Sequence, residues 1–327
     1  MRAAVVTRFG APDVLTVTEV PEPRAGAGEV LIDVEVASVL WLETMIRRGS
    51  GPPGHAVDPP YVPGNGVGGR VRAVGPAVGE EWVGRRVVAH TGGGGGYAEQ
   101  IALPVKSLSV VPDDLPVAAA AALLHDGVTA MTVLDTTEVT GQDRVLVVGA
   151  SGGIGIVTLQ LAFLRGALVV ATARDEAKLS RLRNLNTGAT IVDSDAPHWV
   201  LQACEVLGSG GATVILDNVG GALGETAFAL IAPGGRFSAH GTPSGRFAVP
   251  DPAEVERLRV TMAGIGDLQP SIATRRQKTD ELMALAAAGR VRNVVGQTFP
   301  LADPASAHAA IENRSVFGAT QLLVRHS

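Results

Sequence analysis

Residues 145–155 read Val-Leu-Val-Val-Gly-Ala-Ser-Gly-Gly-Ile-Gly, an apolar strand pattern that runs directly into a glycine-rich turn and the apolar helix predicted over 156–164. Compared with G-x-G-x-x-G, the turn has Ala150 in the first glycine position, followed by Gly152 and Gly155. Gly152 lets the backbone approach a pyrophosphate, which lies on the helix N-terminus, and Gly155 lets the helix pack closely on the strand. The alternative is a tight turn without a ligand. We predict a dinucleotide-binding turn with contacts from Ser151, Gly152, Gly153 and Ile154.

The next predicted strand, 168–171, selects the form of the dinucleotide. An NAD site places Asp or Glu at the end of this strand, whereas an NADP site places a cation there for the 2′-phosphate. Here the strand continues as Ala171-Thr-Ala-Arg174, and Lys178 follows one helical turn later. A guanidinium donates two parallel hydrogen bonds to a phosphate, so the pattern predicts NADPH. The alternative is a surface ion pair between Arg174 and Asp175.

Outward from this turn, predicted strands and helices alternate. Strands are expected over 144–148, 168–171, 190–192, 213–217 and 236–240, with helices 153–165 and 175–185 among those between them. Alternation of this kind indicates βαβ units and a doubly wound parallel sheet, so the fold class is α/β. This dinucleotide-binding domain is expected over 117–269, beginning with an Ala-rich helix over 117–124.

The first 112 residues have a different pattern. Short β-branched segments at 14–19, 29–36, 69–74, 86–90 and 97–103 are separated by Pro, Gly and Asp. After an amphipathic helix at 279–288, strand patterns return at 291–299 and 321–324. We therefore expect a discontinuous β-rich domain made of residues 1–116 and 270–327.

Composition excludes several classes of protein. The 327 residues carry a formal net charge of −5 and show no clustered basic run, which argues against nucleic-acid binding. The single cysteine, Cys204, excludes a disulfide framework and any multi-cysteine metal site. The N-terminus lacks the apolar core of a signal peptide, and no apolar stretch indicates a membrane span. The expectation is a soluble, cytoplasmic protein.

Beyond the turn, short motifs follow one another in a specific order. They are Val62-Pro-Gly64, Gly69-Arg-Val71, Gly96-Tyr-Ala-Glu99, Gly127-Val-Thr-Ala130, the turn at 150–155, Asp217-Asn-Val-Gly-Gly221, Gly234-Gly-Arg236, Gly241-Thr-Pro-Ser-Gly245 and Glu312-Asn-Arg314 before Gly318. With these motifs the chain resembles the medium-chain dehydrogenase/reductases, specifically their zinc-free quinone oxidoreductase branch, which includes zeta-crystallin. The resemblance covers nearly the whole chain and implies a GroES-like catalytic domain plus a Rossmann domain, with cofactor and substrate in the cleft between them, and a homodimer.

Zinc-dependent relatives take their catalytic ligands from three positions, which here hold Leu40, Asn65 and His125. One ligand-capable side chain in three does not hold Zn²⁺, which takes three protein ligands plus an open position, so no metal is expected. Without a Lewis acid to polarise an alcohol, the hydride acceptor must already be electrophilic. The resemblance therefore implies a quinone or an activated C=C bond as acceptor.

The resemblance also implies positions along the cofactor and the substrate. Thr129 corresponds to a residue near the nicotinamide, and Asn218, Val219, Gly241 and Thr242 follow strands on the cofactor side. Leu40, Trp41 and Met45 replace more polar residues of the family and, with Asn65, are expected to form an apolar wall for a bulky hydrophobic substrate. The alternatives are ordinary strand-end turns for the first group and core packing for the second.

The proton source stays open among three candidates. Tyr61 precedes Val62-Pro-Gly64 and His125 occupies the third zinc position, so each is a candidate catalytic acid, and solvent is the third. Tyr97 is expected to be structural. Two other functions also stay open: an enoyl reductase acting on a CoA- or carrier-linked chain, with Arg47-Arg48 and Arg275-Arg276 as a basic entrance, and a non-catalytic NADPH-binding protein.

Overall fold

The computed structural model describes residues 1–52, 54–55 and 57–324. The chain divides into two compact units, one of Met1–His125 with Ile272–Ser327 and one of Asp126–Ser271. The chain passes from the first unit to the second within a single helix, α2 (Val117–Thr136).

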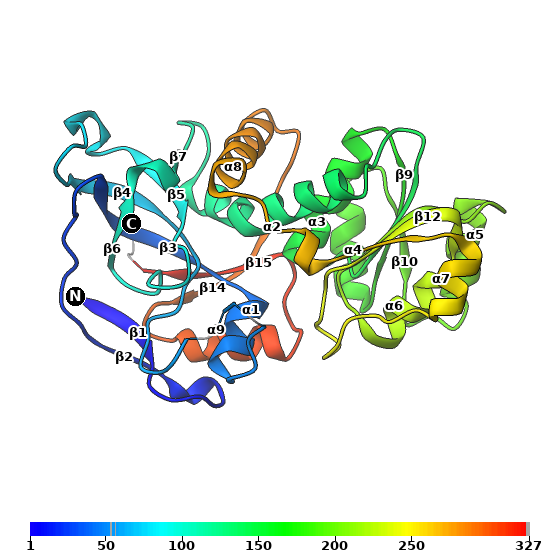
Figure 1. Cartoon of the computed structure of the whole chain (residues 1–327), viewed down its shortest axis with the longest axis horizontal. Coiled ribbons are helices and arrows are strands. Elements are labelled where there is room, and N and C mark those ends of the chain that lie inside the picture. Colours follow the sequence, from blue (N-terminus) through cyan, green and yellow to red (C-terminus); the bar gives the residue numbers. More distant parts are fainter. Residues whose placement is uncertain (53, 56, 325–327) are drawn as a thin grey trace. The chain divides into compact units, whose positions relative to one another are not determined.

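The first unit is built on an antiparallel-rich sheet, coloured mainly blue, cyan and red in Figure 1. Its seven strands follow the order β14-β15-β3-β4-β5-β7, and β6 pairs with β3. The C-terminal strand pairs antiparallel with β3, Thr320 opposite Val39, so the end of the chain joins the N-terminal sheet as the sequence predicts. The strands are β3 (Glu29–Val39), β4 (Gly66–Val74), β5 (Arg86–His90), β6 (Gln100–Pro104), β7 (Leu108–Val110), β14 (Val295–Pro300) and β15 (Ala319–Leu323).

Smaller elements complete this unit. Residues 29–36 of β3 alternate between half-buried and buried positions, as expected for a strand with one face on a core, and residues 37–39 are all buried. A separate two-stranded sheet pairs β1 (Arg2–Val6) with β2 (Leu15–Glu19). The helices are α1 (Trp41–Arg47), α8 (Ile272–Ala287) and α9 (Pro304–Glu312), with 3₁₀ turns at Pro12–Val14, Glu80–Trp82 and Val105–Ser107.

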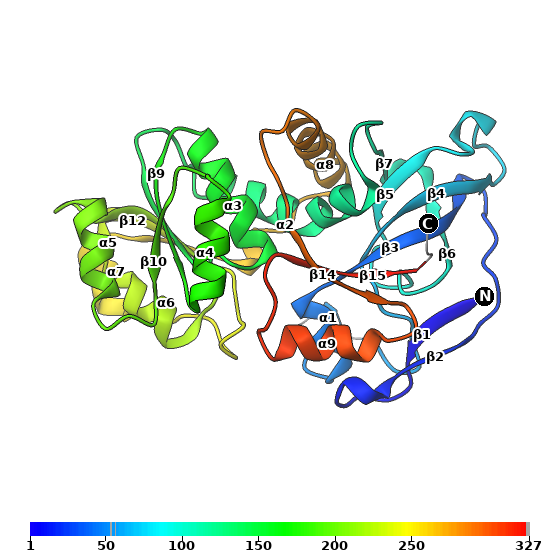
Figure 2. The same cartoon turned by 180° about the vertical axis from the view of Figure 1, so that it is seen from behind.

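The second unit is a parallel sheet with helices on both faces (Figure 2). Its six strands follow the order β10-β9-β8-β11-β12-β13, so the chain winds outward in one direction from β8 and in the other from β11. Ligands of such sheets bind at the carboxyl ends of the strands where the winding changes direction. The strands are β8 (Arg144–Val148), β9 (Leu168–Ala173), β10 (Thr190–Asp193), β11 (Ala212–Asp217), β12 (Ile231–Ala239) and β13 (Thr261–Gly264).

The helices of the second unit connect these strands. They are α3 (Gly153–Leu164), α4 (Glu176–Asn184), α5 (Trp199–Leu207), α6 (Gly221–Phe228) and α7 (Pro252–Leu258), and a 3₁₀ turn covers Ile265–Asp267. The central strand β8 is fully buried from Val145 to Val148 because helices cover both faces. The predicted α/β class, a β-rich unit plus a doubly wound parallel sheet, is therefore confirmed.

Two predicted helix boundaries were wrong. The helix expected to end at Leu124 continues through Gly127 to Thr136, because Gly127 costs only about 1 kcal/mol in a helix that is otherwise rich in apolar residues and largely buried. His125 and Thr129 therefore lie on α2, one helical turn apart. The sequence had instead predicted that His125 precedes a non-helical turn and that Thr129 lies in it. The last long helix, α8, begins at Ile272 instead of Thr279.

Helix α2 is also long and apolar enough to cross a membrane, by length and composition alone. In this structure 72% of its most apolar 18-residue window is buried inside the protein, as in a core helix.

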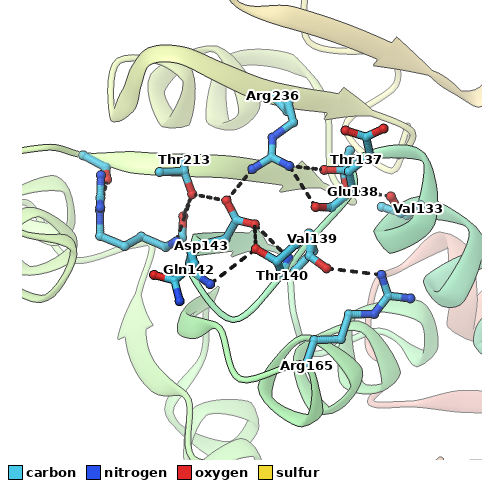
Figure 3. A network of polar contacts seen from close by, with 12 residues as sticks. Val133, Thr137, Glu138, Val139, Thr140, Gln142, Asp143, Arg165, Thr213 and Arg236 are labelled. Atoms are coloured by element: carbon cyan, nitrogen blue, oxygen red, sulfur yellow. Dashed lines mark hydrogen bonds and ion pairs between the residues drawn. The ribbon is translucent and has the colours of Figure 1, made fainter.

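A polar network fixes the amino end of the parallel sheet (Figure 3). Arg236 donates to the carbonyls of Thr137 (2.7 Å) and Glu138 (2.9 Å), and it also pairs with Asp143. Asp143 in turn accepts hydrogen bonds from the Thr213 hydroxyl (2.7 Å) and from the Thr140 N–H (2.8 Å). The network joins the end of α2 to β8, β11 and β12, at the edge of the sheet opposite the expected ligand site.

Candidate functional site

The glycine-rich turn joins β8 to α3 with the geometry that a phosphate cradle needs. Gly149 has a φ of +73°, and Gly152 is the N-cap of α3. A Cβ at Gly155 would lie 2.6 Å from Ala150 Cα, so only glycine allows this close packing of helix on turn. A Cβ at Gly152 would meet nothing within 4 Å, which leaves open space beside the helix N-terminus. The turn therefore fits a pyrophosphate.

Three strand ends converge on this turn. A Cβ at Gly149 would overlap the Val219 side chain, which follows β11, and a Cβ at Gly241, after β12, would overlap the backbone of Asn218. The Asn218 side chain donates from Nδ2 to the Val148 carbonyl at 3.0 Å. The structure thus brings together the candidate cofactor residues 151–154, Asn218, Val219 and Gly241.

His240 belongs to this group, although it was not among the predicted site residues. Its Nε2 lies 3.0 Å from Asn218 Oδ1 and its Nδ1 lies 3.0 Å from the Ser238 hydroxyl. Burial lowers the pKa of His240 to about 4, so at neutral pH the imidazole is uncharged. Because the amide oxygen of Asn218 can only accept, this hydrogen bond belongs to the tautomer that carries the proton on Nε2. His240 therefore fixes the orientation of the Asn218 amide. The signal available in the sequence was its place at a strand end, directly before Gly241.

The two predicted cations lie where β9 ends and α4 begins. Arg174 directly follows β9, and Lys178 lies in the first half of α4. The pKa of Lys178 is lowered, first by partial burial and second by the neighbouring charge of Arg174. The carboxylate of Asp175 caps α4 by accepting from the Ala177 N–H at 2.8 Å. Two adjacent cations at this strand end fit a phosphate on the ribose.

In the first unit, Glu43 joins the segments that carry two candidate substrate residues. This side chain is 1% exposed and accepts hydrogen bonds from the backbone N–H of Asn65 (2.7 Å) and of Leu40 (3.0 Å), as well as from the Tyr97 hydroxyl (2.6 Å). Burial raises the pKa of Glu43, and these donors act in the opposite direction. Glu43 therefore holds Leu40 and Asn65 in place. The sequence analysis missed it, although its spacing from Leu40 is that of a helix-capping carboxylate.

His125 is packed inside the first unit. Its ring contacts His90 edge to face, with centroids 4.3 Å apart, and a Cβ at Gly66 would lie 2.8 Å from His125 Nε2. His125 also forms a hydrogen bond with the backbone of Asn65, so these two predicted residues are neighbours. Burial lowers the pKa of His125 to about 4 and that of His90 to about 2. Both rings are therefore neutral at pH 7.

The positions that bind zinc in relatives lie close together through these contacts, but the donors do not fit the metal. Leu40 and Asn65 both donate to Glu43, and His125 bonds to Asn65. Within 1–52, 54–55 and 57–324, no group of three or more His, Cys, Asp or Glu side chains is arranged to hold a metal ion.

The remaining candidates are more buried than their predicted roles require. The Tyr61 hydroxyl is buried, and burial, followed by the charge of Glu43, raises the pKa of Tyr61 to about 12. Trp41 packs against the core of its unit, in keeping with the core-packing alternative, and Met45 is half-buried. The expectation of a basic Arg47-Arg48 entrance was wrong for Arg47, whose side chain is 0% exposed and pairs with Glu312.

The sequence matches two known domain families: "Alcohol dehydrogenase GroES-like domain" over residues 26–113 and "Zinc-binding dehydrogenase" over 187–319. A 2-haloacrylate reductase of Burkholderia sp is 30% identical over 98% of both chains. A quinone oxidoreductase of Pseudomonas aeruginosa is 28% identical over 96% of this chain and 97% of its own.

Two solved structures have the same fold along their whole length. An NAD-dependent alcohol dehydrogenase matches with a TM-score of 0.90, 30% identity and coverage of 99% of this chain and 100% of the other. A mycobacterial protein in complex with NADPH matches with a TM-score of 0.87, 30% identity and the same coverage. With its GroES-like unit, its doubly wound sheet and these relatives, the chain belongs to the quinone oxidoreductase family of medium-chain dehydrogenases/reductases.

Proposed function

We propose that this protein is an NADPH-dependent reductase that transfers hydride to a quinone or to an activated C=C bond. Two features of the second unit together carry the proposal. Arg174 and Lys178 lie close to each other after β9, and the glycine turn at the start of α3 leaves open space beside the helix N-terminus. The turn fits a pyrophosphate and the cations fit a 2′-phosphate. A mycobacterial relative was solved with NADPH, which supports this choice, whereas another relative is named NAD-dependent, so the preference needs measurement.

NADPH, when bound, supplies the hydride. The N–H groups of Gly153 and Ile154 would bind its pyrophosphate, with Ser151 and Gly152 beside them, and Arg174 and Lys178 would bind the 2′-phosphate. Asn218, held by His240, together with Val219, Gly241 and Thr242, would line the rest of the dinucleotide. Thr129 is proposed to contact the nicotinamide end.

Leu40, Trp41, Met45 and Asn65 are the proposed acceptor-binding residues. Leu40 and Asn65 stand where zinc-dependent relatives have metal ligands, and neither side chain suits Zn²⁺, so the acceptor must be activated by its own structure. Quinones, enones and other α,β-unsaturated carbonyl compounds meet this requirement. The relative named 2-haloacrylate reductase favours an electron-poor C=C bond among them.

His125 and Tyr61 stay the protein's own candidates for the proton donor, with solvent as the third. At pH 7 an imidazole with a pKa of about 4 is almost wholly deprotonated, and a phenol with a pKa of about 12 gives up its proton reluctantly. These values favour water as the acid. The homodimer and the cytoplasmic location stay predictions.

The proposal is tested by following NADPH absorbance with a panel of quinones, enones, haloacrylates and CoA-linked enoyl chains. Turnover on at least one class supports it, and the preferred class names the acceptor. Saturable NADPH binding without turnover on any class would favour a non-catalytic binding protein. Turnover only on CoA-linked enoyl chains would favour the biosynthetic alternative, which the burial of Arg47 makes less attractive.

A further inference from the structure

An acidic side chain lies against the first turn of the phosphate-binding helix. Asp126, half-buried on α2, faces Gly153, the first residue of α3. A Cβ added to Gly153 would lie 2.5 Å from the carboxyl carbon of Asp126 and would overlap its Oδ2. A side chain at Gly153 would therefore force the Asp126 carboxylate to move, whereas the neighbouring Gly152 has open space around it. Both residues belong to the second unit.

The amino end of α3 is a favourable place for a negative charge. The helix is 12 residues long, and its first hydrogen bond to the turn is donated by the Ile156 N–H to the Gly152 carbonyl. The N–H groups of Gly153, Ile154 and Gly155 precede that bond, so no carbonyl of the helix serves them. The helix dipole adds to their attraction for an anion. Asp126 supplies such an anion from within the chain.

A pyrophosphate bound at the same turn brings further negative charge to the same N–H groups. We propose that Asp126 is an affinity-determining residue: its carboxylate competes with the pyrophosphate for the amino end of α3 and so weakens the binding of the dinucleotide. This inference rests on the proposed function, because it assumes that a dinucleotide binds at this turn. The competition concerns the pyrophosphate, so it acts equally on NADPH and NADH and leaves the choice between them to Arg174 and Lys178.

The test compares Asp126→Asn, which keeps the shape and removes the charge, with the wild-type protein. Dissociation constants are measured by calorimetry for NADPH, NADH, ADP-ribose and 2′-AMP. We expect the three pyrophosphate-containing ligands to bind about 2- to 30-fold more tightly to Asp126→Asn, the range for one charge at a helix end. Binding of 2′-AMP, which has no pyrophosphate, should not change.

A matched control removes the same charge elsewhere in the unit. Asp195 is exposed, so Asp195→Asn should leave all four constants unchanged. Asp126→Ala should act in the same direction as Asp126→Asn, and a gain of affinity cannot come from partial unfolding.

The outcomes separate this inference from the proposed function. Wild-type binding of NADPH with unchanged or weaker binding of ADP-ribose to both Asp126 variants would overturn the inference. An equal gain for 2′-AMP, or for Asp195→Asn, would also overturn it, since the effect would then be one of net charge. A wild-type protein that binds no dinucleotide would instead contradict the proposed function.

Discussion

The imidazole of His240 and the amide of Asn218 form a hydrogen bond of 3.0 Å at the carboxyl edge of the parallel sheet. On its other side the same amide donates to the Val148 carbonyl at 3.0 Å. Asn218 is therefore held between the ends of β8 and β12, and its backbone packs directly against Gly241. Strand ends that are far apart in the sequence thus lie next to one another at the candidate cofactor site.

The first prediction follows from this contact. His240→Ala removes the donor to Asn218 Oδ1 and lets the amide rotate, so NADPH and NADH should both bind about 5-fold more weakly, the value of one hydrogen bond of about 1 kcal/mol. Fluorescence titration measures the change. His198→Ala is the control, because His198 is exposed and does not cap α5 through its side chain. Equal losses in the two variants would contradict a role for His240.

The second prediction concerns the 2′-phosphate. Arg174→Ala should weaken NADPH binding by about 1–3 kcal/mol, the scale of a charge-assisted hydrogen-bonded contact, and leave NADH nearly unaffected. Arg183→Ala serves as the control, because Arg183 lies on α4, the helix that follows Arg174, and pairs with Glu176 at 2.9 Å. If NADPH and NADH lose the same affinity, Arg174 does not recognise the 2′-phosphate.

The third prediction concerns the proton. The imidazolium fraction of His125 falls tenfold for each pH unit above its pKa of about 4, so at pH 7 very little acid is present. We expect His125→Gln to change kcat by less than about threefold on quinones and enones, with solvent as the acid. A loss of about 10²- to 10⁴-fold on enones, the usual contribution of a positioned acid, would identify His125 as the donor.

The fourth prediction concerns stability against acid. Burial lowers the pKa of His90, His125 and His308 to about 2, 4 and 3, below the value of about 6.5 in an unfolded chain. Below pH 6.5 the unfolded state therefore binds more protons than the folded state, so the free energy of unfolding decreases as the pH falls. Above pH 6.5 the three imidazoles are mostly neutral in both states and cost no stability. We expect Tm to fall steadily from pH 6.5 to pH 4.

His308→Gln tests the assignment of that loss. Replacing this imidazole should make the decline of Tm with falling pH shallower, even if the variant is less stable at pH 7. An unchanged slope would show that His308 titrates normally in the folded protein.

Local sequence patterns predicted the central parts of the fold. The strand, turn and helix around Gly152 need only an apolar run, glycines and a helix start, all of which are adjacent in sequence. Arg86–His90 and Arg144–Val148 were predicted with their observed bounds. The predicted end of α2 at Leu124, shortly before Gly127, was wrong, because the burial of the helix outweighs the low helix propensity of one glycine.

The polar contacts were not predictable in this way. Glu43 meets Asn65 and Tyr97, and Asp126 meets Gly153, across 22 to 54 residues of sequence that the fold brings together. Arg47 looked like an exposed cation beside Arg48, yet its partner Glu312 lies near the end of the chain. Such contacts depend on the pairing of distant segments, which a single sequence does not specify.

The most direct measurement is isotope transfer from NADPH deuterated at C4 of the nicotinamide, with each C4 epimer incubated with the best enone in ordinary water. The account predicts that one epimer places a single deuterium on the β-carbon of the reduced product, with hydrogen from water at the α-carbon. Reduced product that carries no deuterium from either epimer, or NADPH that binds and is never consumed, would contradict it.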